Sequence, residues 1–283
     1  PVRILRVAKF AARLHPHGFQ IAAETLELMR RMVADGEVDA LVPDRVWKET
    51  EEALRGSNLR VYFEALRECG ALAVLFPEVD ALFGVPQPEQ WHPEVDTGVH
   101  LMMVLDQAEK ISDDLEVRFA ALTHDLGKGT TPRHHLPGHA GHETRGLKLI
   151  RQLSERLRVP KACRDLALIV SEFHTHCHRA LELRAKTLLK VLERTDAFRR
   201  PERFEQFLLA CEADARGRLG LEDRRYPQAD YLRGAFAAAA AVDAGAIAKD
   251  HAKSKIPKAI RRARLAALRE YRRSGSAVEV DEH

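Results

Sequence analysis

The chain has 283 residues, of which 45% are hydrophobic and 31% are charged, which is ordinary for a soluble globular protein. Aromatic residues make up only 6%, while Ala, Leu, Arg and Glu dominate, so the composition favours helix over strand. No run of 18 apolar residues occurs, which argues against a membrane-spanning protein and against a membrane partner. The length allows two domains or one large helical domain.

The cysteines form neither a disulfide pattern nor a metal pattern. They are scattered, with no Cys-x-x-Cys spacing, at Cys69, Cys163, Cys177 and Cys211. This usage argues for a reducing compartment, and we expect a cytoplasmic protein in which Cys177 is a small core residue. The chain begins with Pro1 and enters a helical pattern at once, so we expect the downstream part of a longer polypeptide.

Helical periodicity dominates the first part of the chain. Pro16 to Gly18 end the first helix, Pro43 with Asp44 opens the third, and Asn58 is a candidate N-cap for the fourth. The predicted helices span about 4–14, 22–33, 43–54 and 61–69, with short helical turns over 70–83.

Residues 86–93 form the clearest linker, because they hold three prolines in eight residues. We place a domain boundary there and expect a loop over 129–142. No convincing strand alternation occurs anywhere. The predicted helices of this part span about 97–111, 115–125, 142–158, 161–175, 185–198, 201–216, 228–242 and 256–273.

Ten of the fourteen histidines fall between His92 and His178, and among them is the pair His124-Asp125, followed by Leu-Gly-Lys. Imidazole and carboxylate side chains together suit a divalent metal ion in a phosphate-hydrolysing site. A metal held there would activate water at neutral pH. We predict that His124 and Asp125 are catalytic and that Lys128 neutralises a phosphate oxygen.

Further ligands must come from other helices. His100 lies 24 residues before His124, His139 and His142 follow in the loop and the next helix start, His174 begins a third cluster, and Asp214 is a late carboxylate. The predicted metal ligands are His100, His124, Asp125, His142, His174 and Asp214.

Several of these residues also have an ordinary structural interpretation. His100 alone is more typical of a partly buried, hydrogen-bonded histidine than of a ligand, and Asp214 is equally typical of an ion pair with Arg216 or Arg218. We expect His134, His135, His176 and His178 to be exposed.

The net charge of +3 is modest, but the cations are gathered into two runs. One contains Arg3, Arg6, Lys9 and Arg13, and the other runs from Lys249 to Arg273. Each run suits a polyanion, and each is also typical of a solvated helix face.

The arrangement His100, His124-Asp125 and His174 resembles the all-helical HD superfamily of metal-dependent phosphohydrolases. Segments 1–13, 43–50, 76–86 and 91–98 resemble bacterial CCA-adding enzymes, which are tRNA nucleotidyltransferases, in the multifunctional form that carries an HD domain. The resemblance covers essentially the whole chain. It implies an all-α fold with a helical neck and body over about 1–86, an HD domain over 94–199 and a helical tail over 200–283.

The resemblance also implies which residues have roles. Arg3, Arg6 and Lys9 match nucleotide-contacting positions of the neck, and guanidinium groups on one helix face suit bases and phosphates. The family's nucleotidyltransferase head, which uses magnesium, precedes these residues, so this chain alone is not expected to add nucleotides. In close relatives the residue after His174 is Asp, whereas here it is Thr175. Either Asp214 or a neighbouring histidine then completes the metal shell, or the site binds metal weakly.

We therefore predict a portion of a tRNA CCA-end repair enzyme that binds the tRNA 3′ end, with ATP and CTP as ligands of the parent enzyme. The HD domain is expected to be a phosphatase, 2′-nucleotidase and 2′,3′-cyclic phosphodiesterase that uses nickel, manganese or cobalt. A homodimer is one alternative for the oligomeric state. A rival prediction is a tRNA-binding module with a degenerate, non-catalytic HD site, and a third is a nucleotide phosphohydrolase unrelated to tRNA.

Overall fold

The computed structural model describes residues 1–274, and the end of the predicted tail, 275–283, lies outside them. Within this range the chain is helical and has no strand, only an isolated bridge between Pro86 and Asp96. The predicted all-α fold is confirmed. No helix among these residues is long and apolar enough to cross a membrane.

The chain divides into two compact units by its internal contacts. Unit 1 comprises residues 1–174 and 209–224, and unit 2 comprises residues 175–208 together with the described residues from 225 onward. The boundary between residues 174 and 175 lies inside the long helix α10 (Lys161–His178), and the boundary between residues 208 and 209 lies inside α12 (Pro201–Arg216). The predicted three-part division at 86–94 and 199–200 stays a prediction.

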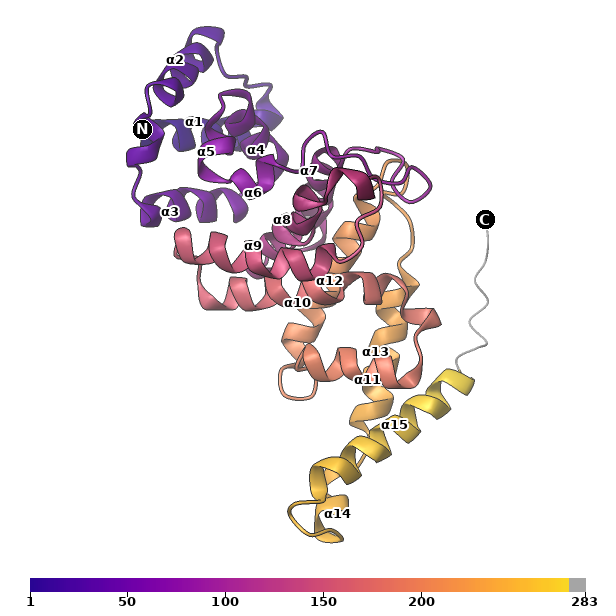
Figure 1. Ribbon diagram of the computed structural model, residues 1–283. Helices are drawn as coiled ribbons and strands as arrows, with labels where there is room; N and C mark the ends of the chain where they lie inside the picture. The colour runs from indigo at the N-terminus through magenta and orange to yellow at the C-terminus, as the bar shows by residue number, and fades with distance from the viewer. Residues whose placement is uncertain (275–283) are drawn as a thin grey trace. The chain divides into compact units, whose positions relative to one another are not determined.

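The first helices of unit 1 pack around α1 (Val2–Leu14), which lies against α3 (Pro43–Leu54) and α4 (Leu59–Glu68) (Figure 1). Ile4, Leu5 and Ala8 recur at helical spacing on α1 and are completely buried there. The predicted first four helices are confirmed within two residues at each end. The remaining elements of this part are η1 (His15–His17), α2 (Ala23–Ala34), η2 (Glu37–Ala40), α5 (Ala71–Leu75) and α6 (Pro77–Asp80).

The predicted capping role of Asn58 is wrong, although its position is right. Asn58 precedes α4 in the left-handed conformation, φ 57°, and its side chain makes no cap hydrogen bond. Its amide nitrogen instead donates to the carbonyl oxygen of Ala12 at 3.0 Å. Asn tolerates this backbone region better than most residues, so here it serves as a turn residue that ties α4 to α1.

The second group of elements in unit 1 begins with α7 (Thr97–Ile111), whose bounds are those predicted. Asp96 caps it by accepting a hydrogen bond from the backbone of Val99. Both α7 and α8 are largely apolar around their circumference, as expected for helices in a core. The elements that follow are α8 (Leu115–Thr123), η3 (Leu126–Thr130), η4 (Arg133–His135), α9 (His142–Arg156) and α10.

Two glycines allow η3, α9 and α10 to approach closely. A Cβ on Gly127 would lie 1.9 Å from the carbonyl oxygen of His142, and a Cβ on Gly146 would lie 2.5 Å from the hydroxyl of Ser171. At Gly127 the clash is with backbone, so only glycine fits there. The contacts bring the start of α9 against the turn that follows His124, and the middle of α10 against α9.

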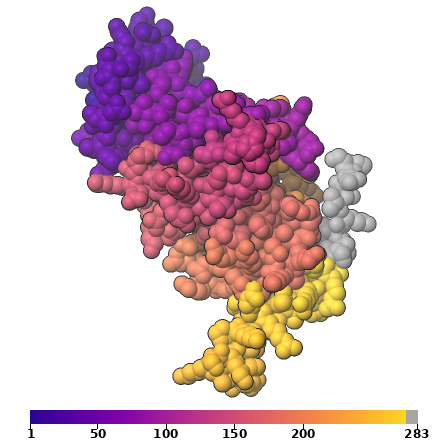
Figure 2. Space-filling model, viewed as in Figure 1, coloured from indigo at the N-terminus to yellow at the C-terminus, as the bar shows by residue number. Residues whose placement is uncertain are grey.

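Unit 2 is built around α15 (Ile256–Ser274), which packs on α11 (Ala185–Arg194) and α13 (Pro227–Ala240) (Figure 1). Leu268 of α15 is completely buried, and the guanidinium of Arg264 lies 3.6 Å from the ring centre of Phe198. The helix α14 (Ala244–Lys249), which the sequence did not predict, leads into α15 and stands out from this unit in yellow (Figure 2). The short η5 (Ala180–Glu182) completes the unit.

Candidate metal centre

Four buried histidines in unit 1 share one hydrogen-bonding pattern. The Nδ1 atom of each ring lies at hydrogen-bond distance from a backbone carbonyl oxygen: His100 to Gly217 at 2.9 Å, His124 to Ala121 at 2.7 Å, His142 to His139 at 2.9 Å and His174 to Val170 at 3.0 Å. Because a carbonyl only accepts, Nδ1 carries a hydrogen in each ring. In its neutral form each ring therefore has its lone pair on Nε2, the atom that a metal ion would contact.

These Nε2 atoms meet two carboxylates. The Nε2 of His100 lies 3.1 Å from Oδ1 of Asp214, and the Nε2 of His124 lies 3.7 Å from the same oxygen. On the other side, Oδ1 of Asp125 lies 3.3 Å from Nε2 of His142 and 3.5 Å from Nε2 of His174. The side chains thus form two groups of three, in each of which all ligand atoms lie within 4.8 Å of one another.

The two groups adjoin, since Nε2 of His124 is 3.2 Å from Oδ2 of Asp125. All six side chains are buried, with exposed fractions between 0% for His100 and 9% for His142. Two of the facing atoms, Nε2 of His124 and Oδ1 of Asp125, are buried without a hydrogen-bond partner. Buried polar atoms are normally paired, so these acceptors fit a cation that would lie among them. Nitrogen and carboxylate oxygen are the donors that divalent transition metals take.

The electrostatics of the centre also favour positive charge. Burial opposes protonation of His124, but the charges of Asp125 and Asp214 outweigh it and raise its pKa to about 9. Burial likewise opposes ionisation of Asp125, yet Lys128 and His124 hold the pKa of that carboxyl well below its ordinary value. The ammonium of Lys128 lies 2.6 Å from Oδ2 of Asp125 and donates to Oε1 of Gln87 at 2.9 Å.

Each predicted ligand comes from a different place in the chain. His100 comes from α7, the pair His124-Asp125 follows α8, His142 begins α9 and His174 lies on α10. Asp214, near the end of α12, joins His100 and His124. The structure therefore brings together all six predicted ligands and Lys128, and the two groups are complete without position 175.

The other histidines have the surroundings of ordinary side chains. His134 and His135 are exposed on η4, as expected, whereas His176 and His178 are only partly exposed. The Nδ1 of His178 lies 2.9 Å from the hydroxyl of Tyr226, and Cys177 is buried, as expected. Asp214 lies 3.9 Å from Arg218, while Arg216 pairs with Glu212.

Sequence reasoning missed three residues beside the centre. His92, Glu94 and Gln87 all lie in or next to the proline-rich segment that was interpreted as a linker, and the side chain of Glu94 is only 2% exposed. Glu94 lies 3.0 Å from both His92 and His100. The available signal was that His92 and Glu94 lie within the eight residues before His100.

The predicted nucleotide-contacting residues lie along α1, and two of them are paired within the chain. Glu49 of α3 accepts a hydrogen bond from Nε of Arg6 at 2.9 Å and one from Nζ of Lys9 at 2.5 Å. Lys9 also pairs with Glu52. Arg3 is exposed. The nucleotide-binding role of these residues stays a prediction.

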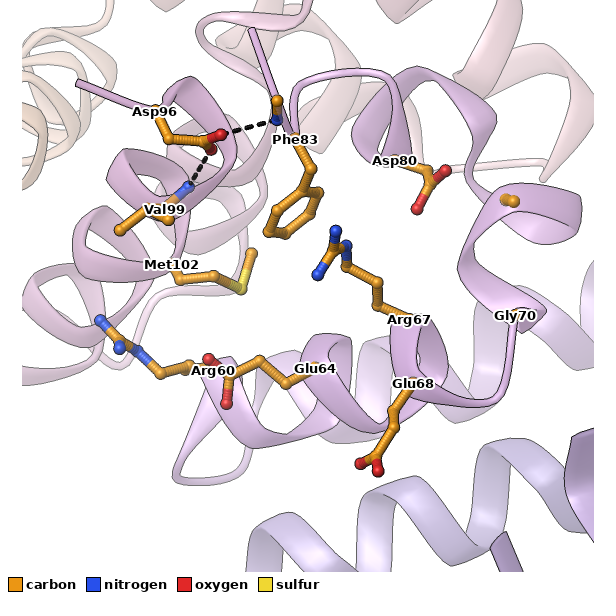
Figure 3. Close-up of a pocket in the computed structure, with 12 residues that line it drawn as sticks. Arg60, Glu64, Arg67, Glu68, Gly70, Asp80, Phe83, Asp96, Val99 and Met102 are labelled. Carbon is orange, nitrogen blue, oxygen red and sulfur yellow. Dashed lines mark hydrogen bonds between the residues drawn. The ribbon is translucent and has the colours of Figure 1, made fainter. Parts of the chain in front are cut away.

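A separate pocket of about 830 Å³ lies between α4 and α7 (Figure 3). Arg67 points into it and its guanidinium lies 4.0 Å from the ring centre of Phe83. No lining residue belongs to the two ligand groups. The arginines Arg60 and Arg67 are outnumbered by four carboxylates, so the pocket does not attract phosphate. Those carboxylates are Glu64, Glu68, Asp80 and Asp96.

Two sequence families match the chain. The family described as "HD domain" matches residues 97–200, and the family described as "Probable RNA and SrmB- binding site of polymerase A" matches residues 18–83. The HD match contains five of the six ligands, while Asp214 lies beyond it.

Full-length relatives decide the family. The multifunctional CCA protein of Thioalkalivibrio sulfidiphilus is 60% identical over 271 residues, which are 95% of this chain and 66% of the relative. That of Pseudomonas fluorescens strain SBW25 is 56% identical over 96% of this chain and 67% of its own length. The chain belongs to the family of multifunctional CCA proteins. It spans about two thirds of the length of these relatives, and the HD domain places it among metal-dependent phosphohydrolase-type proteins.

Proposed function

We propose that this chain is a metal-dependent phosphohydrolase that acts on the 3′ end of tRNA, within a protein that adds or repairs the CCA end. One observation carries the hydrolase proposal. Four buried imidazoles and two buried carboxylates face one another inside the core, and two of their facing atoms, Nε2 of His124 and Oδ1 of Asp125, have no hydrogen-bond partner. That arrangement is costly to bury unless a cation is bound there.

His100, His124 and Asp214 would hold a divalent cation on one side, and Asp125, His142 and His174 on the other. Such a cation, when bound, supplies a Lewis acid and an activated water for phosphoester hydrolysis. The hydrogen bonds from Nδ1 to backbone carbonyls orient the imidazoles before the metal binds, which is the usual role of such outer contacts. Lys128 lies against Asp125 and supplies a fixed positive charge for a phosphate oxygen.

The proposed substrates are phosphomonoesters, 2′-nucleotides and 2′,3′-cyclic phosphates, which are the forms that a damaged tRNA end takes. Nickel, manganese and cobalt suit the nitrogen-rich ligand set. Support for RNA as the partner comes from the match at residues 18–83 and from the exposed cations of unit 2. Those on α14, α15 and the turn between them include Lys253, Lys255, Lys258, Arg262 and Arg269.

ATP and CTP are proposed as ligands of the longer protein, whose relatives are named multifunctional CCA proteins. A cytoplasmic location and a homodimer remain parts of the proposal that follow from the sequence alone.

The test is to purify the chain, remove metal with a chelator and restore Ni²⁺, Mn²⁺ or Co²⁺ singly. We expect hydrolysis of 2′-AMP, 2′,3′-cyclic AMP and a chromogenic phosphodiester only in the presence of metal. Elemental analysis is expected to find at least one ion per chain. Metal uptake without hydrolysis of any of these compounds would contradict the hydrolase proposal.

The rival candidate, a tRNA-binding module with a non-catalytic HD site, is distinguished by the same preparation. Both candidates predict tRNA binding that weakens steeply between 50 and 200 mM salt, because phosphate contacts release counterions. Only the hydrolase predicts metal uptake and turnover. Absence of tRNA binding at low salt together with intact turnover would favour a nucleotide phosphohydrolase unrelated to tRNA.

A further inference from the structure

Beside the metal centre lies a carboxylate that belongs to neither of the groups that would hold the cation. The side chain of Glu94 is 2% exposed, and four donors surround it. Its Oε1 receives hydrogen bonds from Nε2 of Gln87 at 3.2 Å and Nδ1 of His92 at 3.0 Å, and lies 3.0 Å from Nδ1 of His100. Its Oε2 accepts from the backbone of Leu219 at 3.3 Å.

Two of these contacts concern the first ligand group directly. The ring of His100 places its Nδ1 between Glu94 and the carbonyl of Gly217, which leaves Nε2 directed at Asp214. The contact with Leu219 holds the chain just after α12, the helix that carries Asp214. One buried carboxylate thus contacts both the ring of His100 and the segment next to Asp214.

His92, Glu94 and His100 also satisfy the distance criterion for a metal-binding trio. They do not suit a second cation, because the nitrogen of His100 that faces Glu94 carries a hydrogen, as does the nitrogen of His92. Because a carboxylate only accepts, the ring of His92 donates to Oε1 of Glu94 through Nδ1. The trio is therefore a hydrogen-bonded network in which Glu94 is the common acceptor.

The backbone around Glu94 is held in a strained form. Val95 has φ 59°, which is a rare conformation for a β-branched residue. Hydrogen bonds on both sides hold it there: the backbone of Gln87 donates to the carbonyl of Val95 at 2.8 Å, and that of Thr97 donates to Val85 at 3.0 Å. Such strain persists only where its surroundings enforce it, and it gathers at functional sites.

The same network reaches the second side of the centre. Gln87 donates to Glu94 through Nε2 and accepts from Lys128 through Oε1 at 2.9 Å, and Lys128 contacts Asp125. The segment from Gln87 to Glu94 therefore contacts both His100 and the ammonium group of Lys128, which lies beside Asp125.

We propose that Glu94 is a positioning residue of the metal centre, which orients His100 through Nδ1 and fixes Asp214 through Leu219. This inference rests on the proposed function in that it takes the six-residue centre to bind a divalent metal. In many metal sites a carboxylate accepts a hydrogen bond from the ring nitrogen of a histidine ligand that faces away from the metal, and so orients the ring. Loss of such a carboxylate typically weakens metal affinity about 10–100-fold.

The experiment compares the chain with its variants Glu94→Gln and Glu94→Ala. The apoprotein is titrated with Co²⁺, whose visible absorption reports both affinity and ligand geometry. We expect affinity to fall about 10-fold for Glu94→Gln, which keeps one oxygen acceptor, and about 100-fold for Glu94→Ala. At saturating Co²⁺ both variants are expected to show an altered visible spectrum, because His100 is no longer fixed.

Glu89→Gln is the matched control. Glu89 is an exposed carboxylate of the same segment, five residues before Glu94. We expect its Co²⁺ affinity and spectrum to equal those of the parent. The thermal midpoint of each metal-free protein is measured alongside, because a purely structural Glu94 would change that midpoint while leaving the spectrum at saturation unchanged.

Unchanged affinity and spectrum in Glu94→Gln, while the parent binds Co²⁺, would overturn the positioning role and leave the proposed function intact. A parent that binds Co²⁺ but hydrolyses nothing would overturn the proposed function, while the graded loss of affinity would still support the role of Glu94. A parent that binds no Co²⁺ would overturn both.

Discussion

Helix α1 and the metal centre both gather ionisable side chains from distant parts of the sequence, but they satisfy them differently. On α1 the cations Arg6 and Lys9 meet the carboxylate of Glu49, so donors face acceptors. In the centre, imidazole nitrogens face the oxygens of Asp125 and Asp214, and Nε2 of His124 and Oδ1 of Asp125 have no hydrogen-bond partner. The first arrangement is complete within the chain, whereas the second suits a bound cation. The difference separates charge that stabilises a fold from charge that is available to a ligand.

The largest expected effect breaks the centre itself. Asp125 belongs to the group with His142 and His174 and also lies next to His124 of the other group. We therefore expect Asp125→Ala to abolish tight metal binding. Phosphoester turnover should then fall by about three orders of magnitude or more, since metal catalysis supplies several kcal/mol and each 1.36 kcal/mol is tenfold in rate. Steady-state rates and elemental analysis measure both effects. His134→Ala, which changes an exposed histidine, is the control and should keep the turnover of the parent. Turnover within twofold of the parent in Asp125→Ala would contradict the proposed metal centre.

The next effect tests the packing that brings α9 to the centre. In Gly127→Ala the new Cβ would meet the carbonyl oxygen of His142 at 1.9 Å, which no rotation of a side chain relieves. We expect a loss of about 1–3 kcal/mol in the free energy of unfolding, as for other overpacked sites, together with weaker metal binding. Urea denaturation and a Co²⁺ titration check this. Gly138→Ala, in an exposed loop with one contact at 3.2 Å, should be nearly neutral.

A smaller effect is expected on α1, where charges are paired. Glu49→Gln leaves Lys9 and Arg6 beside a neutral, buried amide, and we expect a loss of about 1–2 kcal/mol in the free energy of unfolding. Glu52→Gln, whose side chain is 48% exposed, should change it by less than about 0.5 kcal/mol. Equal stability in both variants would mean that the α1 cations are not stabilised by Glu49.

The pH dependence of the same pair is the smallest effect. Burial raises the pKa of Glu49, but hydrogen bonds from Lys9 and Arg6 outweigh it and hold the pKa below 4.5. Burial likewise lowers the pKa of Lys9, and its bonds to Glu49 and Glu52 outweigh this and raise it above 10.5. The stabilisation is then complete between about pH 4.5 and 10.5. It is lost as pH falls through the lowered pKa of Glu49 or rises through the raised pKa of Lys9.

Denaturation of the parent and Glu49→Gln across this range measures the difference. The gap between the two proteins should be constant in the middle and close at the acid end, and it should narrow at the alkaline end, where Arg6 still pairs with Glu49. A gap that persists at pH 2 would contradict the assignment to the charge of Glu49.

The helices were predictable because their apolar residues recur at helical spacing, and the bounds of α7 and α12 were predicted to the residue. The helix over residues 244–249 was not predicted, because it is short and has no buried residue that would give an apolar pattern. The six predicted ligands were chosen from residue type and family resemblance, and the structure places them in two adjoining groups. Their common tautomer was not predictable, because it is set by backbone carbonyls such as those of Gly217 and Ala121, which sequence does not reveal.

The segment 86–93 shows what sequence reasoning did not reach. Three prolines exclude a helix, and the structure has turns there, but the sequence did not reveal that two side chains of this segment are buried. Gln87 is 2% exposed and His92 is 9% exposed. Proline fixes the backbone irrespective of whether a segment is exposed or buried, so composition alone could not distinguish the two.

The HD match at residues 97–200 does not contain every residue of the centre, because Glu94 precedes the match and Asp214 and Leu219 follow it. The smallest piece that keeps every contact of the centre runs from Gln87 to Leu219. A protein engineer who transfers only residues 97–200 would leave out Asp214 and the contacts of Glu94. Transfer of the proposed metal centre therefore requires residues 87–96 and 201–219 as well.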